Sequence, residues 1–364
     1  MRPIDIVAAA AKALAIAALA CLAFVLASIA VFRIERAADF ASQRTRLSAL
    51  RATNPGPSAS LAADLALPDD LGFGRLRLLA THNSYRRASG PLHLFYIGLV
   101  EPVWPAKLAY SHPSLTEQLD SGLRSFELDV RNRDSGLELA HIPLVDERGF
   151  EPDFALALEE LALWSDRNPG HVPIVLLLEL VQDYSFLDPA LRPWDGPGLD
   201  RLDGAIRAGL GSRLVEPDQL RGSAPTLSSA LAKGWPKLGA LRGQFIVILH
   251  KNDQLRALYI ALRPNLEGRA MLTCAPAGAP DAAVDVLNDP VGDAPAIRAE
   301  ASAGILVRTR ADADLVYSPG LLKAALDSGA RIVSTDFPLG RPTKDGYYAA
   351  LPGDRTMDLL PARP

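Results

Sequence analysis

The chain has 364 residues with a formal net charge of −4 at pH 7, and 49% of its residues are hydrophobic. This length and composition allow one large core or two ordinary domains and exclude a disordered or repetitive chain. No dense block of Lys and Arg is present, so a nucleic-acid partner is not expected, because phosphate backbones require a concentrated positive surface. The two cysteines, Cys21 and Cys274, cannot build a thiolate zinc cluster, which leaves oxygen and imidazole ligands for any metal.

The first predicted element is a membrane-directed helix within residues 1–36. Residues 13–32 are 20 apolar or small residues preceded by Arg2 and Lys12, enough for a helix to cross about 30 Å of hydrocarbon. This run is longer than the roughly 7–15-residue apolar core of a cleavable signal peptide, which favours an uncleaved anchor over a cleaved signal. Arginines follow the run about as densely as basic residues precede it, so the positive-inside rule does not decide its orientation. We expect the rest of the chain to be exported, either anchored or secreted after cleavage.

Residues 37–70 are predicted to form a linker, because they are rich in Ala, Ser, Arg and Pro and include NPGPSAS. From residue 71 to 364, short apolar runs alternate with helical patterns, which is typical of βα units and a parallel sheet. The eight predicted strands are 75–81, 125–131, 137–141, 173–180, 245–250, 271–275, 305–309 and 331–336. The predicted helices between them are 115–121, 154–167, 198–209, 226–233, 254–262, 294–303 and 320–328.

This order of elements predicts an α/β fold, a (β/α)8 TIM-type barrel. We expect a distortion at residues 137–141, which follow the preceding strand without a helix. A doubly wound open sheet is the alternative, because periodicity alone does not separate the two folds.

Polar side chains are concentrated at the carboxyl ends of the first four predicted strands, where barrel enzymes place their active sites. These residues are His82, Asn83, Glu127, Asp129, His141 and Glu179. Alternation along a strand puts Glu127 and Asp129 on one face, where they can share a cation. The one amide and three carboxylates suit Ca²⁺, and Mg²⁺ less well, while two histidines suit proton transfer near neutral pH. A lone histidine or a Glu-x-Asp pair is often structural or solvated, so the combination carries the functional interpretation.

Other polar residues follow later strands, where they could contact substrate phosphates or hydroxyls. They are Lys251, Arg308 and Asp336, and an ion-paired structural role is the alternative for each. The long connection at 86–112 carries Phe95, Tyr96, Trp104 and Tyr110 among apolar residues. It could form a lid or a lipid-docking loop, or a subdomain that packs its own small core over the barrel.

The strings LLATHNSY, SHPSLTEQLDSGLRSFELDVRNRDSGLELAH, HVPIVLLLEL, RTRADAD and DSGARIVSTDFPLG follow one another between residues 76 and 338. Together they resemble the calcium-dependent phosphoinositide-specific phospholipase C family, within the superfamily of phospholipase C-like phosphodiesterases. The resemblance implies a distorted barrel, one bound Ca²⁺ and cleavage of a phosphodiester by a neighbouring inositol hydroxyl. By position, it implies that His82 stabilises the phosphoryl group and His141 protonates the leaving alcohol. It also implies four calcium ligands, Asn83, Glu127, Asp129 and Glu179.

Two other functions stay open at this point. A glycerophosphodiester phosphodiesterase has a similar fold and Glu-x-Asp pair, but its first-strand motif typically places Arg after the histidine, where this chain has Asn83. A catalytically inactive, membrane-tethered barrel that binds headgroups is the other alternative, and the intact His82 and His141 argue against it. The expected partners are a membrane and phosphatidylinositol or another phosphodiester.

Overall fold

Eight parallel strands form a closed ring in the computed structural model, which describes residues 3–53, 56–313 and 316–360. Around the ring the strands are β1 (Leu76–Thr81), β2 (Ser125–Arg133), β4 (Ile174–Leu180), β5 (Phe245–Leu249), β6 (Leu272–Cys274), β7 (Ala282–Val286), β8 (Leu306–Arg310) and β11 (Ile332–Thr335). Strand β11 pairs with β1, and β1 pairs in turn with β2. The TIM-type barrel is therefore confirmed, and the open sheet is excluded because the ring closes. Residues 54–55 of the expected linker and Asp314 of the string RTRADAD lie outside the described residues.

Few residue pairs join the first two strands of the ring, which lie next to the expected distortion. Only two residue pairs join β1 to β2, whereas six pairs join β2 to β4. The predicted strand at 137–141 is β3 (Gly136–Leu139), which runs antiparallel to β2 in a hairpin and is not part of the ring. Its place among the eight is taken by β7, which the sequence analysis did not predict. The segment AAVDV begins with two alanines, contains an acidic residue and follows β6 without a helix between them, so it lacks the alternation with a helical pattern that indicates a strand.

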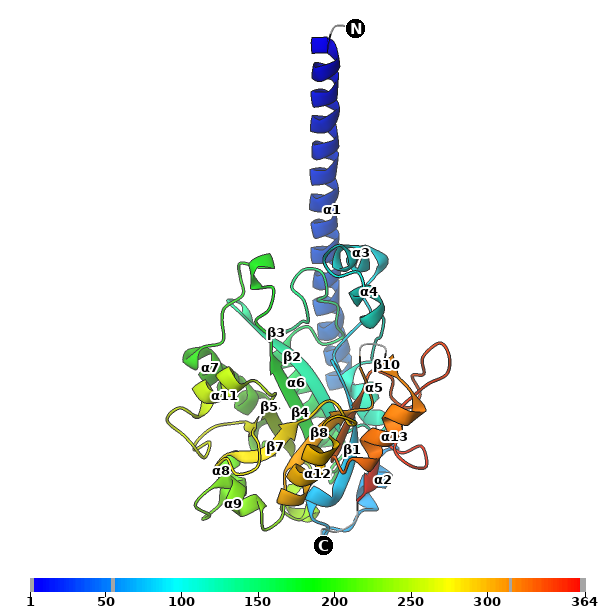
Figure 1. Ribbon diagram of the computed structural model, residues 1–364. Helices are drawn as coiled ribbons and strands as arrows, with labels where there is room; N and C mark the ends of the chain where they lie inside the picture. The colour runs from blue at the N-terminus through cyan, green and yellow to red at the C-terminus, as the bar shows by residue number, and fades with distance from the viewer. Residues whose placement is uncertain (1–2, 54–55, 314–315, 361–364) are drawn as a thin grey trace.

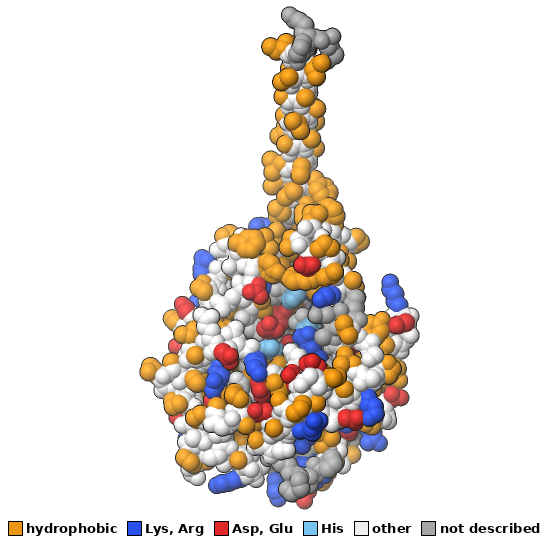
Figure 2. Space-filling view, viewed as in Figure 1, with side chains coloured by type: hydrophobic (Ala, Val, Ile, Leu, Met, Phe, Trp, Pro, Cys, Tyr) orange, Lys and Arg blue, Asp and Glu red, His pale blue; other side chains and the backbone are white. Residues whose placement is uncertain are grey.

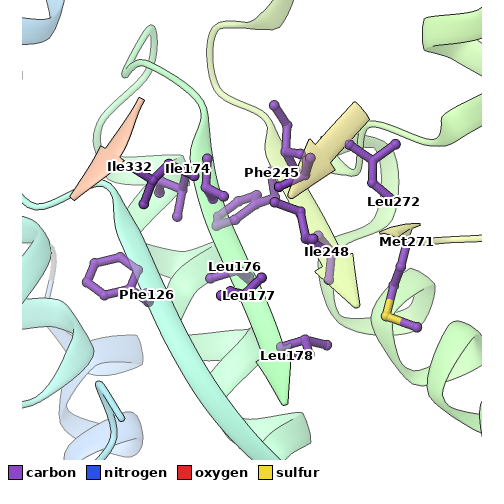
Figure 3. Close-up of a cluster of buried hydrophobic side chains, with 14 of the residues drawn as sticks. Phe126, Ile174, Leu176, Leu177, Leu178, Phe245, Ile248, Met271, Leu272 and Ile332 are labelled. Atoms are coloured by element: carbon purple, nitrogen blue, oxygen red, sulfur yellow. The ribbon is translucent and has the colours of Figure 1, made fainter. Parts of the chain in front are cut away.

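The core lies inside the ring and between the ring and its helices. Strand β4 reads IVLLLEL and is buried along nearly its whole length, as expected for a parallel strand covered on both faces. Figure 3 shows side chains of this core gathered from β2, β4, β5 and β11, among them Phe126, Leu177, Ile248 and Ile332.

Helices and short strands surround the ring (Figure 1). The helices after α1 are α2 (Leu61–Leu65), α3 (Pro91–Val100), α4 (Trp104–Lys107), α5 (Leu115–Asp120), α6 (Phe154–Arg167), α7 (Gly196–Leu210), α8 (Pro217–Arg221), α9 (Leu227–Leu231), α10 (Leu238–Leu241), α11 (Asp253–Ile260), α12 (Ala294–Ala303) and α13 (Pro319–Asp327). The remaining short elements are η1 (Phe73–Arg75), η2 (Ser185–Leu187), η3 (Gly211–Arg213), β9 (Asp312–Ala313), β10 (Val316–Tyr317) and β12 (Met357–Leu359). Helix α5 begins at a capping box in which Ser114 accepts from the Glu117 amide and Glu117 accepts from the Ser114 amide.

The longest element is α1 (Pro3–Ala52), which projects from the barrel beside α3 (Figure 1). Its first half is exposed, and its second half packs against the barrel wall. The structure differs here from the expected linker, because the helix continues without a break to Ala52. Arg36, Asp39, Gln43 and Leu47 recur at spacings of three or four residues, so they form one helical face that is buried on the barrel.

Candidate active site

A cleft of about 440 Å³ opens where the sequence analysis placed the site. Figure 2 shows it as a hollow that contains histidine and acidic side chains below the base of α1. Five of the six predicted residues line it: His82, Asn83, Asp129, His141 and Glu179. The sixth, Glu127, is buried beside them on β2, with a carboxylate oxygen within 4.8 Å of a carboxylate oxygen of Glu179. The loops after β1 and β3 and the strands β2 and β4 thus bring the predicted set together.

The His82 ring lies between the carboxylate of Asp336 and the guanidinium of Arg310. Its Nδ1 lies 2.8 Å from Oδ1 of Asp336, and its Nε2 lies 2.8 Å from Nη2 of Arg310. A guanidinium only donates hydrogen bonds, so Nε2 accepts and Nδ1 carries the proton that is donated to Asp336. Burial and the nearby Arg310 charge hold the pKa of His82 well below its usual range. His82 is therefore a neutral imidazole in this arrangement.

His141 has a carboxylate partner of its own. Its Nδ1 lies 2.8 Å from Oδ2 of Asp146, and Asp146 also accepts hydrogen bonds from Arg86 and from the Ser89 hydroxyl. Burial raises the pKa of Asp146, but the charges and hydrogen bonds of Arg86 and His141 outweigh it, so the net pKa lies below its usual range. The ionised carboxylate fixes the proton on Nδ1 and leaves Nε2 as the nitrogen for proton transfer in the cleft.

Three carboxylates converge beside these histidines. Burial, followed by the charges of Glu179 and Glu127, raises the pKa of Asp129 well above its usual range. Burial also acts to raise the pKa of Glu127, but Arg308 and His82 lower it to a net value of about 2. Glu127 Oε1 is buried and has no hydrogen-bond partner among the described residues. A crowded group of carboxylates with an unsatisfied buried oxygen fits a hard cation.

Asn83 adds a second sign of a cation. Its φ of 47° lies in the left-handed region, which Asn tolerates better than most residues and which turns its amide toward the carboxylates. In one orientation Nδ2 donates to the Tyr110 hydroxyl, 3.0 Å away, and Oδ1 faces the Asp129 oxygens. In the other, Nδ2 donates to Asp129 at 2.8 and 3.0 Å. Hydrogen bonding alone stabilises the second orientation, whereas a cation bound between Asn83 and Asp129 would stabilise the first.

The three residues predicted to contact the substrate, Lys251, Arg308 and Asp336, have different surroundings. Arg308 is fully buried, where it forms an ion pair with Glu127 and donates to Asn288 and Ser334. Lys251 pairs with Asp285, with 3.0 Å between Nζ and Oδ1, outside the cleft. Asp336 holds the His82 ring, and burial raises its pKa to about 6. Direct contact of these three with a substrate stays a prediction.

Several residues of the site were not assigned a catalytic or metal-binding role from the sequence. His250 brings its ring nitrogen within 4.8 Å of ligand atoms of Glu127 and Glu179, so it joins the candidate metal group. Asp146 orients His141, and Tyr110 reaches both His82 and Asn83. His250 ends a predicted strand, which was a usable signal. Asp146 and Tyr110 lie in connections whose sequence carries no comparable signal.

The family comparison matches most of the chain. A model of the family described as phosphoinositide phospholipase C, Ca²⁺-dependent, matches residues 71–136 and 131–361. No curated protein sequence matches the chain.

Solved structures share the fold at low identity. A calcium-dependent phosphoinositol-specific phospholipase C from a Gram-negative Pseudomonas species, as its myoinositol complex, is 16% identical with a TM-score of 0.57, over 84% of this chain and 100% of that one. A Ca²⁺-dependent phosphatidylinositol-specific phospholipase C from Streptomyces antibioticus is 17% identical with a TM-score of 0.52, over 73% of this chain and 94% of that one.

Proposed function

Because the chain belongs to the Ca²⁺-dependent phosphoinositide phospholipase C family, we propose that it is a membrane-tethered phosphodiesterase that cleaves phosphatidylinositol-like lipids. The observation that carries this proposal is the pair of histidines in one cleft, each oriented by a buried carboxylate. An inactive binding barrel has no need of two imidazoles held in defined tautomers beside a group of carboxylates.

In the proposed phosphoryl transfer, one group of residues acts on the phosphoryl oxygens and another on the leaving alcohol. Arg310 carries the positive charge that stabilises negative charge on the phosphoryl oxygens, and the neutral His82, whose Nε2 accepts from Arg310, holds the guanidinium in place. His141 delivers its Nε2 proton to the leaving alcohol, and Asp146 stabilises the imidazolium before that transfer. A neighbouring hydroxyl of the inositol ring attacks phosphorus and gives its proton to a carboxylate of the site, the bond from phosphorus to the leaving alcohol breaks, and the product is a cyclic phosphate.

The carboxylate group is suited to hold one calcium ion. Its proposed ligands are Asn83, Glu127, Asp129 and Glu179, which are supplied from the loop after β1 and from β2 and β4. Supporting observations are the unsatisfied Glu127 oxygen and the Asn83 oxygen that faces Asp129. When bound, calcium lowers the pKa of the attacking hydroxyl and neutralises charge at the phosphoryl group.

We further propose that α1 is an uncleaved anchor with the barrel on the outer side of the membrane. Its exposed first half is long and apolar enough to cross a bilayer. Buried side chains on α1 begin at Ser28. If a signal peptidase cleaved the chain after Ala27, the half of α1 that packs on the barrel would therefore remain, and the product would be a folded, secreted protein.

Phosphorus NMR of the products tests the reaction. The full-length chain is incubated with phosphatidylinositol vesicles in the presence of calcium or of a chelator. We expect a cyclic inositol phosphate signal with calcium only, and a loss of at least about 10²-fold in rate for His82→Ala or His141→Ala.

Each alternative gives a different product pattern. A non-cyclic phosphate as the first product would favour a glycerophosphodiester-type hydrolysis by water. Unchanged rates in both histidine variants would contradict the proposed roles.

A further inference from the structure

Helix α3 lies beside the end of the apolar part of α1 and the first polar turn that follows it. The Phe24 ring stacks on Tyr96 at 6.2 Å and meets Phe95 edge-on at 6.3 Å. Further along α1, the Phe32 ring contacts His93 at 4.0 Å. A helix rises 1.5 Å per residue, so these contacts cover about 12 Å of α1.

The charges on α1 place those contacts relative to a bilayer. Lys12 and Arg33 bracket residues 13–32, which contain no Asp, Glu, Lys or Arg. Twenty such residues match about 30 Å of hydrocarbon. A shift of the span toward the N-terminus would bring Lys12 and Asp5 into hydrocarbon, where charged side chains are strongly disfavoured. The span at 13–32 leaves α3 level with the last 12 Å or so of the hydrocarbon layer.

Helix α3 has the surface of a lipid-embedded helix. Its sequence PLHLFYIGLV contains no Asp, Glu, Lys or Arg. Phe95, Leu99 and Val100 are 51%, 65% and 74% exposed. Exposure of these apolar side chains is unfavourable in water and favourable in lipid. The polar ring of His93 points inward, where it bonds Glu35 at 2.6 Å and the Val145 carbonyl at 2.9 Å.

The same apolar surface continues onto the wall of the cleft. Trp104 and Tyr184 both line the cleft and meet edge-on at 6.1 Å. Tyr184 contacts Phe186, which is 81% exposed on η2. We call α3, Val103, Trp104, Tyr184 and Phe186 the apolar collar. Figure 2 shows hydrophobic side chains gathered between the hollow and the base of α1.

We propose that the apolar collar is embedded in the leaflet of the bilayer that α1 crosses, so that the cleft opens at the level of the lipid headgroups. This inference rests on the proposed anchor role of α1 and deepens the proposed function by naming how substrate arrives. A lipid reaches the cleft by lateral movement within the leaflet, without leaving the membrane for water. The chain therefore acts on its own bilayer.

Spin labels measure the depth of the collar without any need for turnover. In the full chain with Cys21→Ser in phosphatidylcholine vesicles, a label is attached at Leu99→Cys, with Leu19→Cys on α1 as the lipid reference. Leu262→Cys, at a position 94% exposed after α11, is the aqueous reference. We expect the Leu99 label to be more accessible to oxygen than to a water-soluble nickel complex, like the Leu19 label. A Leu99 label as accessible to nickel as the Leu262 label would overturn the proposal.

Activity provides a second test. Leu99→Asp should lower turnover of phosphatidylinositol in vesicles by about 10-fold or more, because a carboxylate resists insertion into lipid. Turnover of a short-chain soluble phosphatidylinositol should be unchanged, which separates failed docking from failed chemistry. Leu262→Asp is the matched control. Equal vesicle rates for the two variants would contradict embedding, whereas absence of turnover in every protein would contradict the proposed function and leave the depth result standing.

Discussion

Single residues in this protein act through partners that are distant in sequence. His82 and Asp336 are 254 positions apart, yet their contact decides which ring nitrogen of His82 carries the proton. His141 depends in the same way on Asp146, which Arg86 and Ser89 hold in place. The histidines were predictable from their position after strands. Their tautomers were not, because a tautomer follows from hydrogen bonds that only the folded chain makes.

A buried histidine away from the cleft allows a prediction on stability. His171 accepts from the Ser165 hydroxyl at Nε2 and donates to the Val172 carbonyl from Nδ1, and burial lowers its pKa from 6.5 to about 4. Between these two values the unfolded chain binds a proton that the folded chain does not, so stability falls as the pH falls from 6.5 toward 4. A shift of about 2.5 units corresponds to about 3 kcal/mol.

We expect His171→Gln, which cannot titrate, to reduce this pH dependence. The measurement is the free energy of unfolding in urea at pH 7.5 and at pH 4.5 for both proteins. The variant is expected to be less stable at both pH values, with a smaller difference between them. An equal difference in the two proteins would show that His171 does not take up a proton on unfolding.

At the scale of elements, α1 is part of the folded domain as well as an anchor. Arg36 donates to the Glu147 carbonyl, and Asp39 pairs with Arg148 at 2.6 Å. These contacts hold the loop that contains Asp146, the partner of His141. The second half of α1 therefore supports the candidate site, and a truncation that begins after Ala52 would remove this support.

Arg46 of α1 gives a quantitative test of this role. It lies 2.8 Å from Glu151 and 3.4 Å from Glu160, two carboxylates that are fully buried. Removal of one partner from a buried ion pair costs about 3–5 kcal/mol. Burial and Glu160 already raise the pKa of Glu151 well above its usual range, so Glu151 can take up a proton and soften the loss.

We therefore expect Arg46→Met to lower the free energy of unfolding by about 2–3 kcal/mol. Arg51→Met is the matched control, because Arg51 pairs with Glu159 on the same two helices but in an exposed position. The control should cost less than about 1 kcal/mol. Similar values for the two variants in urea unfolding would mean that α1 is attached only as an anchor.

At the scale of the whole molecule, closure of the barrel brings the proposed calcium ligands together. They come from the loop after β1 and from β2 and β4, so an ion bound there would link β1 to β2, which only two residue pairs join, and to β4. Without a cation, the repulsion among Glu127, Asp129 and Glu179 opposes this closure.

Calcium should accordingly stabilise the fold by mass action. At a concentration about 100 times its Kd, a ligand that binds only the folded chain adds about 2.7 kcal/mol, seen as a higher Tm. Asp129→Asn should raise the Tm in chelator, because it removes one negative charge from the group, and should abolish the rise with calcium. A variant that keeps the full calcium-dependent rise would exclude Asp129 as a ligand.

Local patterns were sufficient for most of the barrel and for its polar residues, because strand and helix periodicity and the carboxyl-end rule act over short stretches of chain. Helix α6 and helix α12 were predicted to the residue, and the family resemblance is confirmed. Three features needed the folded chain. The segment of β7 is not separated from β6 by a helical pattern, so its pairing with β6 and β8 is what identifies it as a strand. The polar half of α1 looked like a linker, because its buried face is defined by the barrel that it packs against. The level of α3 along α1 depends on contacts between residues about 70 positions apart, which no local pattern encodes.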